Sequence, residues 1–201
     1  MRKILTLVFI LISLAGFSGE PEPQKGGKDA KIMENERPAG DKLSFDEQLV
    51  LAEQGIASSQ FIIGRMCEKG EGIKQDSVAA AKWYQKAAEQ GFVKGQYNIG
   101  VMYYQGEGVQ KDYKEAMKWF LKAAEQGFVK AQHNIGVMFQ MGEGVTKDFT
   151  QAYSWFTIAA SSDDKHSAMF RDLIEKEMVP AKIEEGKKLS TEWLENHPQK
   201  K

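Results

Sequence analysis

The sequence predicts an all-α protein, a right-handed α-solenoid of about three 36-residue helix-turn-helix repeats with capping helices. Tryptophans recur every 36 residues, at Trp83, Trp119 and Trp155. A Gly-Glu-Gly triplet recurs at the same step, beginning at Gly70, Gly106 and Gly142. A fixed period of this length is the signature of stacked repeats, because one helical hairpin cannot bury both of its faces alone.

Composition excludes several classes of function. Lys and Arg number 27 against 28 Asp and Glu, which gives a formal charge of −1 and no bulk basic field for nucleic acid. The single cysteine, Cys67, excludes an intrachain disulfide framework and a multi-cysteine metal site. The histidines share no metal-ligand spacing. We therefore expect no nucleic-acid partner, no metal and no small-molecule cofactor.

The N-terminus is typical of an export signal. Arg2 and Lys3 precede an apolar run from Ile4 to Phe17, which is shorter than the roughly 20 residues that a spanning helix needs. We predict a signal peptide over residues 1–18 that leaves no stable membrane span, and a periplasmic or secreted location. A bacterial lipoprotein signal would have cysteine where Phe17 stands, so the prediction is a non-lipoprotein. An uncleaved membrane anchor is the alternative.

Composition and period together predict the domain limits. Residues 19–40 contain prolines, glycines and scattered charges, which is typical of a flexible linker. The solenoid is predicted over residues 41–195, with repeats at about 56–91, 92–127 and 128–163, a degenerate C-terminal cap at 164–195 and a tail at 196–201.

Each repeat contains a first helix, helix A, whose apolar residues share one face. In the third copy these residues are Ala131, Ile135, Gly136 and Phe139. Helix A is expected to end at the Gly-Glu-Gly triplet, because glycine tolerates a positive φ angle.

The second helix, helix B, is predicted to begin at a capping aspartate. Asp112 with Glu115 and Asp148 with Gln151 have the spacing of a capping box, whereas Asp76 is followed at that distance by Ala79. Trp119 is expected to fill a gap between helices, and the fixed spacing of Trp83, Trp119 and Trp155 predicts that the tryptophans pack between repeats.

The ends of the array are predicted to differ from the repeats. Upstream, Ser44 to Gln54 resembles the latter half of a helix B. Downstream, Lys165 to Lys176 stands where a fourth helix A belongs but lacks the glycine turn, and Ala181 to Leu194 is an amphipathic closing helix.

The recurring pattern is Ala-x-x-x-Ile/Leu-Gly-x-x-aromatic-x-x-Gly-x-Gly-Val-x-x-Asp-x-x-x-Ala, followed by Trp and an Ala-Ala pair. It resembles the Sel-one-like repeat (SLR) family, relatives of the tetratricopeptide repeat, over roughly Ser44 to Trp193. The resemblance implies an α-solenoid that binds other proteins or cell-envelope components and has no catalytic residues of its own. Some secreted bacterial relatives hold each hairpin with a disulfide, and this chain lacks those cysteines.

A second row of residues on helix A differs between the copies. In similar solenoids, the equivalent row lines the concave groove. We predict that a protein or peptide partner binds there, through Phe61, Arg65, Tyr97, Val101, Tyr104, His133, Val137 and Gln140. Neutral variation at solvent-exposed positions would give the same pattern.

The hypothesis that the protein is an enzyme requires a nucleophile and a base in converging positions. Cys67 aligns with Tyr103 and Phe139 and is expected to be buried and inert, and His133 has no Ser or Cys partner in a plausible register. The sequence therefore favours a non-enzymatic adaptor of the cell envelope or secreted space. The alternative is an envelope hydrolase acting on cell-wall or β-lactam-like substrates.

Overall fold

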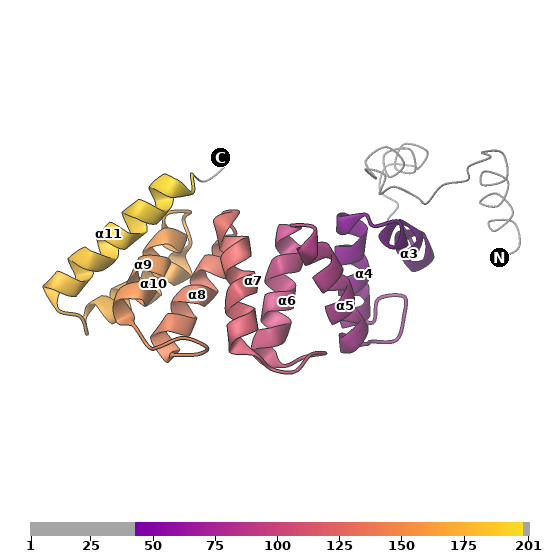
Figure 1. The fold of residues 1–201 in the computed structure, drawn as a ribbon, viewed down its shortest axis with the longest axis horizontal. Helices are drawn as coiled ribbons and strands as arrows, with labels where there is room; N and C mark the ends of the chain where they lie inside the picture. The colour runs from indigo at the N-terminus through magenta and orange to yellow at the C-terminus, as the bar shows by residue number, and fades with distance from the viewer. Residues whose placement is uncertain (1–42, 199–201) are drawn as a thin grey trace, which may run out of the picture. The chain divides into compact units, whose positions relative to one another are not determined.

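The structure, a computed structural model, describes residues 43–198, which form nine α-helices and no strand (Figure 1). The helices are α3 (Phe45–Glu53), α4 (Ala57–Lys69), α5 (Ser77–Glu89), α6 (Val93–Gln105), α7 (Tyr113–Glu125), α8 (Val129–Met141), α9 (Phe149–Ala160), α10 (Lys165–Glu175) and α11 (Pro180–Asn196). The predicted signal peptide and linker lie outside the described residues.

The predicted solenoid is confirmed. Helices α4 and α5, α6 and α7, and α8 and α9 pair as hairpins, and each helix B also packs on the helix A that follows it. Figure 1 shows the hairpins side by side along the array. Helices α4, α6 and α8 are thus the helix A of each repeat, and α5, α7 and α9 are the helix B.

An aromatic ring on helix B packs against a glycine on helix A in every repeat. A Cβ atom on Gly100 would lie 2.8 Å from the ring of Phe120, which is 0% exposed. The same contact joins Gly64 to Tyr84 and Gly136 to Phe156. The glycine therefore sets how closely the two helices approach.

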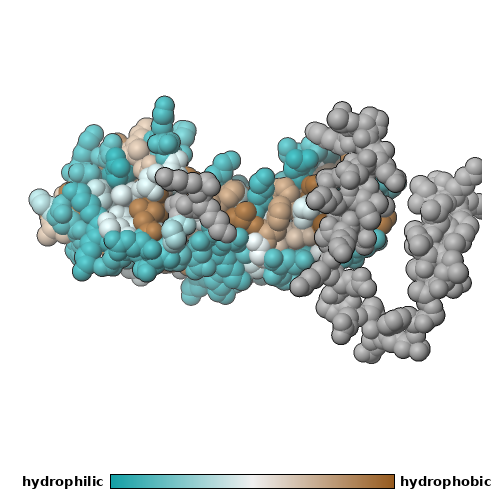
Figure 2. Space-filling view, turned by 90° about the horizontal axis from the view of Figure 1, so that it is seen from above, coloured by the Kyte–Doolittle hydropathy of each residue, from teal (hydrophilic) through white to brown (hydrophobic). Residues whose placement is uncertain are grey.

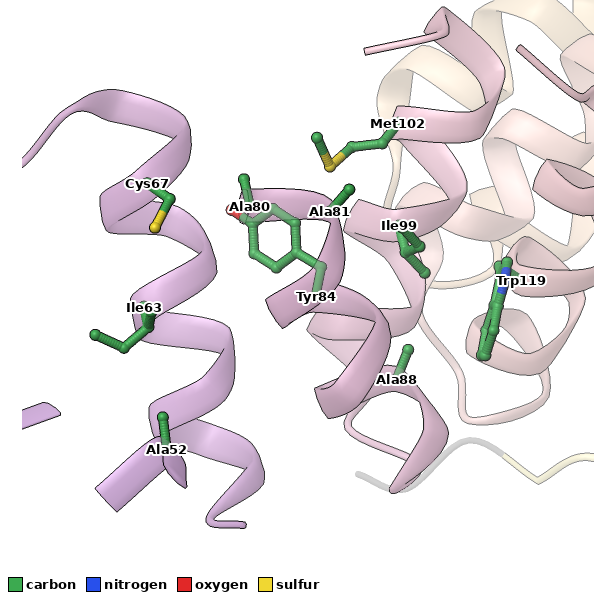
Figure 3. Packing of buried hydrophobic residues seen from close by; sticks show 10 residues of the cluster. All are labelled: Ala52, Ile63, Cys67, Ala80, Ala81, Tyr84, Ala88, Ile99, Met102 and Trp119. Atoms are coloured by element: carbon green, nitrogen blue, oxygen red, sulfur yellow. The ribbon is translucent and has the colours of Figure 1, made fainter. Parts of the chain in front are cut away.

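The predicted packing of Trp119 between repeats is confirmed, but the gap within the hairpin is filled by Phe120. Trp119 is 7% exposed and belongs to a core cluster with Ala88, Ile99 and Met102, which extends back into the first repeat (Figure 3). The aliphatic stem of Lys122 brings its ammonium to 4.2 Å from the indole. Trp119 therefore lies at the seam between repeats.

The glycine turns end helix A as predicted. Gly70, Gly106 and Gly142 cap the three helices in the left-handed conformation, with φ between +72° and +80°. The second glycine of the triplet has a separate role, since a Cβ atom on Gly108 would overlap the carbonyl oxygen of Ser77 in the preceding repeat. Each turn therefore also joins neighbouring repeats.

Aspartates cap each helix B as predicted. Asp112 Oδ1 accepts bonds from the backbone N–H groups of Lys114 and Glu115 at 2.9 and 3.0 Å. The reciprocal half of the predicted capping box is absent from this repeat, because the Glu115 carboxylate accepts from Lys118 Nζ at 2.7 Å. A complete capping box is present at Ser44, which the sequence analysis did not predict.

A glutamine near the start of each helix A is buried and links three successive helices. Gln96 Nε2 donates to the carbonyl of Ala88 at 3.4 Å, and Gln96 Oε1 accepts from Gln126 Nε2 at 2.7 Å. Gln60 makes the equivalent bonds with Ala52 and Gln90. Gln132 donates in the same way to Ala124, but the Gln132 Oε1 atom has no partner among the described residues.

The C-terminal cap departs from the repeat. Helix α10 packs on α9 as a fourth helix A would, but α11 packs on α9 rather than pairing mainly with α10. Trp193 of α11 lies with its ring centroid 4.5 Å from that of Trp155. A Cβ atom on Gly186 would lie 2.8 Å from the Tyr153 ring, so α11 also approaches α9 at a glycine.

No helix within residues 43–198 is both long and apolar enough to cross a bilayer.

Candidate functional site

The residues predicted to bind a partner form what we call the variable stripe, on α4, α6 and α8. All are half-buried. They are Phe61, Arg65, Tyr97, Val101, Tyr104, His133, Val137 and Gln140. None is a core residue and none is fully exposed, so the stripe lies at the boundary between the core and the solvent.

The aromatic members of the stripe pack on helix B and on the next repeat. The Tyr97 ring lies 5.8 Å from that of Phe120 and 5.0 Å from that of Phe128, between centroids. Phe61 repeats this arrangement with Tyr84 and Phe92, and His133 repeats it with Phe156 and Phe170. Within the described residues, no ring contact joins these members of the stripe to one another. They therefore line the seams between repeats in succession.

His133 has a serine partner, which corrects the sequence analysis. His133 Nδ1 lies 2.8 Å from Ser167 Oγ, and the Ser167 hydroxyl donates to Asp164 Oδ2 at 2.5 Å. Because the serine hydrogen is used on Asp164, Nδ1 must carry the hydrogen that faces Ser167. Two hydrogen bonds thus join the Asp164 carboxylate, the Ser167 hydroxyl and the His133 imidazole in that order. They connect α8 to α10.

This cluster lacks the geometry of a nucleophile and its base. Ser167 is fully buried, and its hydroxyl donates to the carboxylate and not to the imidazole that would have to accept its proton. Burial lowers the pKa of His133 below its ordinary value, although the Asp164 charge opposes this. The bond from the Ser167 hydroxyl lowers the pKa of Asp164. The cluster therefore holds a neutral imidazole beside a charged carboxylate near pH 7.

Tyr104 joins the second repeat to the turn of the third. Its hydroxyl donates to Glu143 Oε2 at 2.6 Å, and its ring lies edge-on to that of Tyr113 at 5.2 Å. Burial and the Glu143 charge raise the pKa of Tyr104 above its ordinary value. The Tyr104 hydroxyl is therefore engaged within the chain.

The remaining members of the stripe are aliphatic or polar. Val101 and Val137 pack at the edge of the core clusters. Arg65 Nη2 lies 3.8 Å from Glu71 Oε2. Arg65 Nε and Gln140 Oε1 are buried without a partner in the described part of the chain.

The sequence analysis missed residues that extend the stripe. Helix α10 presents Met169 and Leu173, 52% and 50% exposed, in register with His133 and Val137. Met141, one turn beyond Val137, is 61% exposed. In the view of Figure 2, apolar surface is divided into small patches by hydrophilic residues. The 36-residue period could have identified Met169 and Leu173, because they follow His133 and Val137 by 36 residues.

A concavity of about 230 Å³ opens where α6, α8 and α10 meet. It is lined by Tyr97, Lys130, His133, Asn134, Asp164 and His166. Two members of the variable stripe thus share it with two basic side chains. Among the described residues, no cluster of His, Cys, Asp and Glu side chains could hold a metal ion.

Cys67 is buried in the first core cluster, as predicted (Figure 3). Burial raises the pKa of its thiol, and the charge of Asp76 adds to that effect. A protonated, inaccessible thiol is a poor nucleophile.

Residues 57–92, 93–128 and 129–164 each match the family model described as Sel1 repeat. A Sel1 repeat protein from Oxalobacter formigenes is similar in structure, with 40% identity, a TM-score of 0.62 and coverage of 63% of this chain and 52% of that one. A protective antigen of uropathogenic Escherichia coli with an SLR fold is also similar, with 28% identity and a TM-score of 0.51. The match covers 76% of this chain and 41% of that one. Cysteine-rich protein B of Helicobacter pylori, at 18% identity and a TM-score of 0.52, covers 63% of this chain and 93% of that one and shows the fold alone.

This chain thus spans about half the length of the first two of these proteins. No curated protein matches it.

Proposed function

The chain belongs to the Sel1 repeat family, and from that premise we propose that it is a non-enzymatic adaptor that binds a protein partner through the concave helix A face. Repeats of this family generally serve as scaffolds for protein interaction. The partner contacts the variable stripe and its extension onto α10.

The contrast between constant and variable positions carries the proposal. Residues that hold the fold recur in each repeat, such as the helix A glycine and the buried glutamine. The stripe differs between copies, since Arg65 of the first repeat is replaced by valine in the other two, and Phe61 is followed by Tyr97 and His133. Half-buried aromatic and aliphatic side chains of this kind form the centres of protein interfaces.

The alternative function, an envelope hydrolase, is not supported by the cluster of Asp164, Ser167 and His133. A serine hydrolase requires an accessible hydroxyl that donates to its base, whereas Ser167 is buried and donates to Asp164. Cys67 is equally inaccessible.

The proposed location is the cell envelope or the secreted space, supported by the apolar run that follows Arg2 and Lys3. N-terminal sequencing of the mature protein tests this. Removal of about 18 residues is expected, whereas an intact Met1 in the membrane fraction would favour the anchor.

Site-specific photo-crosslinking in intact cells tests the binding face. A photoreactive amino acid at Gln105 or Met141, both exposed beside the stripe, should capture a partner. The matched controls are Lys82 and Lys114, exposed on helix B, which should capture much less of that protein. Capture at the helix B positions alone would contradict the proposed face.

A further inference from the structure

A row of basic side chains borders the variable stripe. The second residue of α6, α8 and α10 is Lys94, Lys130 and His166, and each is exposed. Because these helices occupy equivalent places in successive repeats, their second residues lie at the same edge of the groove. None of the three side chains forms an ion pair within residues 43–198.

The opposite edge of the groove is acidic, but most of its charge is already engaged. Glu68 accepts from the Tyr84 hydroxyl at 2.8 Å, and Glu143 accepts from Tyr104. Glu71 lies within 4.0 Å of Arg65 and Lys69. Glu107 is the turn acid that has no such partner in the described part of the chain. Most acids at this edge therefore have partners within the chain, whereas Lys94 and Lys130 at the other edge form no ion pair in the described residues.

The basic edge also contains the concavity between α6, α8 and α10. Lys130 and His166 line it together with the Asn134 side chain, and Asp164 is the acid that faces them. Asp164 Oδ2 already accepts from the Ser167 N–H at 2.9 Å and from the Ser167 hydroxyl. These two bonds engage the Asp164 carboxylate within α10, and neither Lys130 nor His166 forms an ion pair with it.

We infer that the partner segment is acidic, with carboxylates placed along Lys94, Lys130 and His166 and apolar side chains on the stripe beside them. This inference rests on the proposed function, because it names the chemistry of the segment that the groove binds. The apolar part of the segment contacts Val101 and Val137 and reaches Leu173 on α10. Charge complementarity of this kind sets the choice of partner and the rate of association.

A random dodecapeptide display library tests the inference. The wild-type chain should select peptides enriched in Asp and Glu together with Leu, Ile or aromatic residues. The double variant Lys94→Glu, Lys130→Glu should bind the selected peptides about tenfold more weakly, because attraction at the edge becomes repulsion. The matched control Lys82→Glu, Lys114→Glu makes the same charge change on helix B and should bind within about twofold of wild type.

Crosslinking of the selected peptides separates the two proposals. Acidic peptides that crosslink at Gln105 or Met141 and lose affinity in the Lys94, Lys130 variant support both. Peptides that crosslink there without acidic enrichment, or that keep their affinity in the variant, overturn the charge inference and leave the groove standing. Crosslinking only at Lys82 or Lys114, or no enrichment above empty beads, contradicts both.

Discussion

Close packing within each hairpin depends on a single glycine on helix A. At Gly64, Gly100 and Gly136 an aromatic ring from helix B occupies the space that a side chain would need. Core packing of this density tolerates added volume poorly, because neighbouring side chains must leave their preferred rotamers. A single methyl group at these positions therefore tests the described packing.

Gly100→Ala is expected to destabilise the chain by about 1–3 kcal/mol, despite the higher helix propensity of alanine. Its Cβ would lie 2.8 Å from the Phe120 ring. Urea unfolding measures the change, and Gln105→Ala on the exposed end of the same helix is the control. Phe120→Leu in the Gly100→Ala background should cost less than Phe120→Leu alone. Equal costs would mean that the ring does not contact the glycine.

His133 makes stability depend on pH. Its pKa is lowered in the folded chain, so as pH falls below about 6.5 the unfolded chain binds a proton that the folded chain does not. The free energy of unfolding should therefore decrease from pH 7.5 to pH 5.5. His133→Phe, which places the residue of Phe61 at the equivalent position, should reduce this decrease. Asp164, whose pKa is also lowered, acts in a separate window at lower pH.

Urea unfolding at pH 7.5, 6.5 and 5.5 checks this expectation. The control is Tyr97→Phe, an aromatic exchange at the equivalent position of the preceding repeat that leaves His133 in place. If His133→Phe shows the same pH dependence as wild type and this control, the imidazole does not carry the effect.

At the scale of the helices, the buried glutamines connect successive hairpins, and the last connection is incomplete. Ser162 stands where the pattern of Gln90 and Gln126 would continue. The backbone there is equivalent, since Ser162 N–H donates to Ala159 at 3.2 Å as Gln126 N–H does to Ala123. A buried acceptor without a partner costs roughly 1–3 kcal/mol.

Ser162→Gln should supply the missing donor to Gln132 Oε1 and stabilise the chain by about 0.5–1.5 kcal/mol. Gln126→Ala should have the opposite effect, because it removes the donor to both Gln96 and the carbonyl of Gly91. Thermal or urea unfolding measures both, and Glu125→Ala is the exposed neighbouring control. No gain from Ser162→Gln would show that Gln132 Oε1 is already satisfied.

The period of 36 residues was sufficient to predict the helices of the repeats, their glycine turns and the aspartates that cap each helix B. It could not identify which of two adjacent aromatic residues, Trp119 or Phe120, faces the helix A glycine. Both positions are aromatic in every repeat, so the period carries no information about their orientation. The distances to Gly100 decide this, and only the packed structure provides them.

The partners of the candidate site were missed for a related reason. Reasoning from the period placed equivalent positions beside one another, whereas the observed contacts join non-equivalent positions. His133 contacts Ser167, 34 residues on, and Tyr104 contacts Glu143, 39 residues on. Neighbouring helices cross at an angle and are offset along their axes, so contacts do not follow the period of the sequence.

At the scale of the whole array, α11 closes the C-terminal end by covering α9. Trp193→Ala removes the half-buried ring beside Trp155 and should cost about 1–3 kcal/mol. Because repeats interact mainly with their neighbours, amide exchange should accelerate most in α9 and α11 and least in α4 and α5. Uniform acceleration along the chain would instead mean that the array unfolds as one unit.

Binding through the variable stripe is the central functional claim, and hydrogen exchange of the full chain with and without the partner captured by crosslinking tests it most directly. Residues 97–105 of α6 and 133–141 of α8 should be protected by the partner, together with the exposed face of α10. The helix B elements α5 and α7 should exchange as they do in the free chain. Protection of α5 and α7 with α6 and α8 unchanged would contradict the claim and place the interaction on the helix B surface.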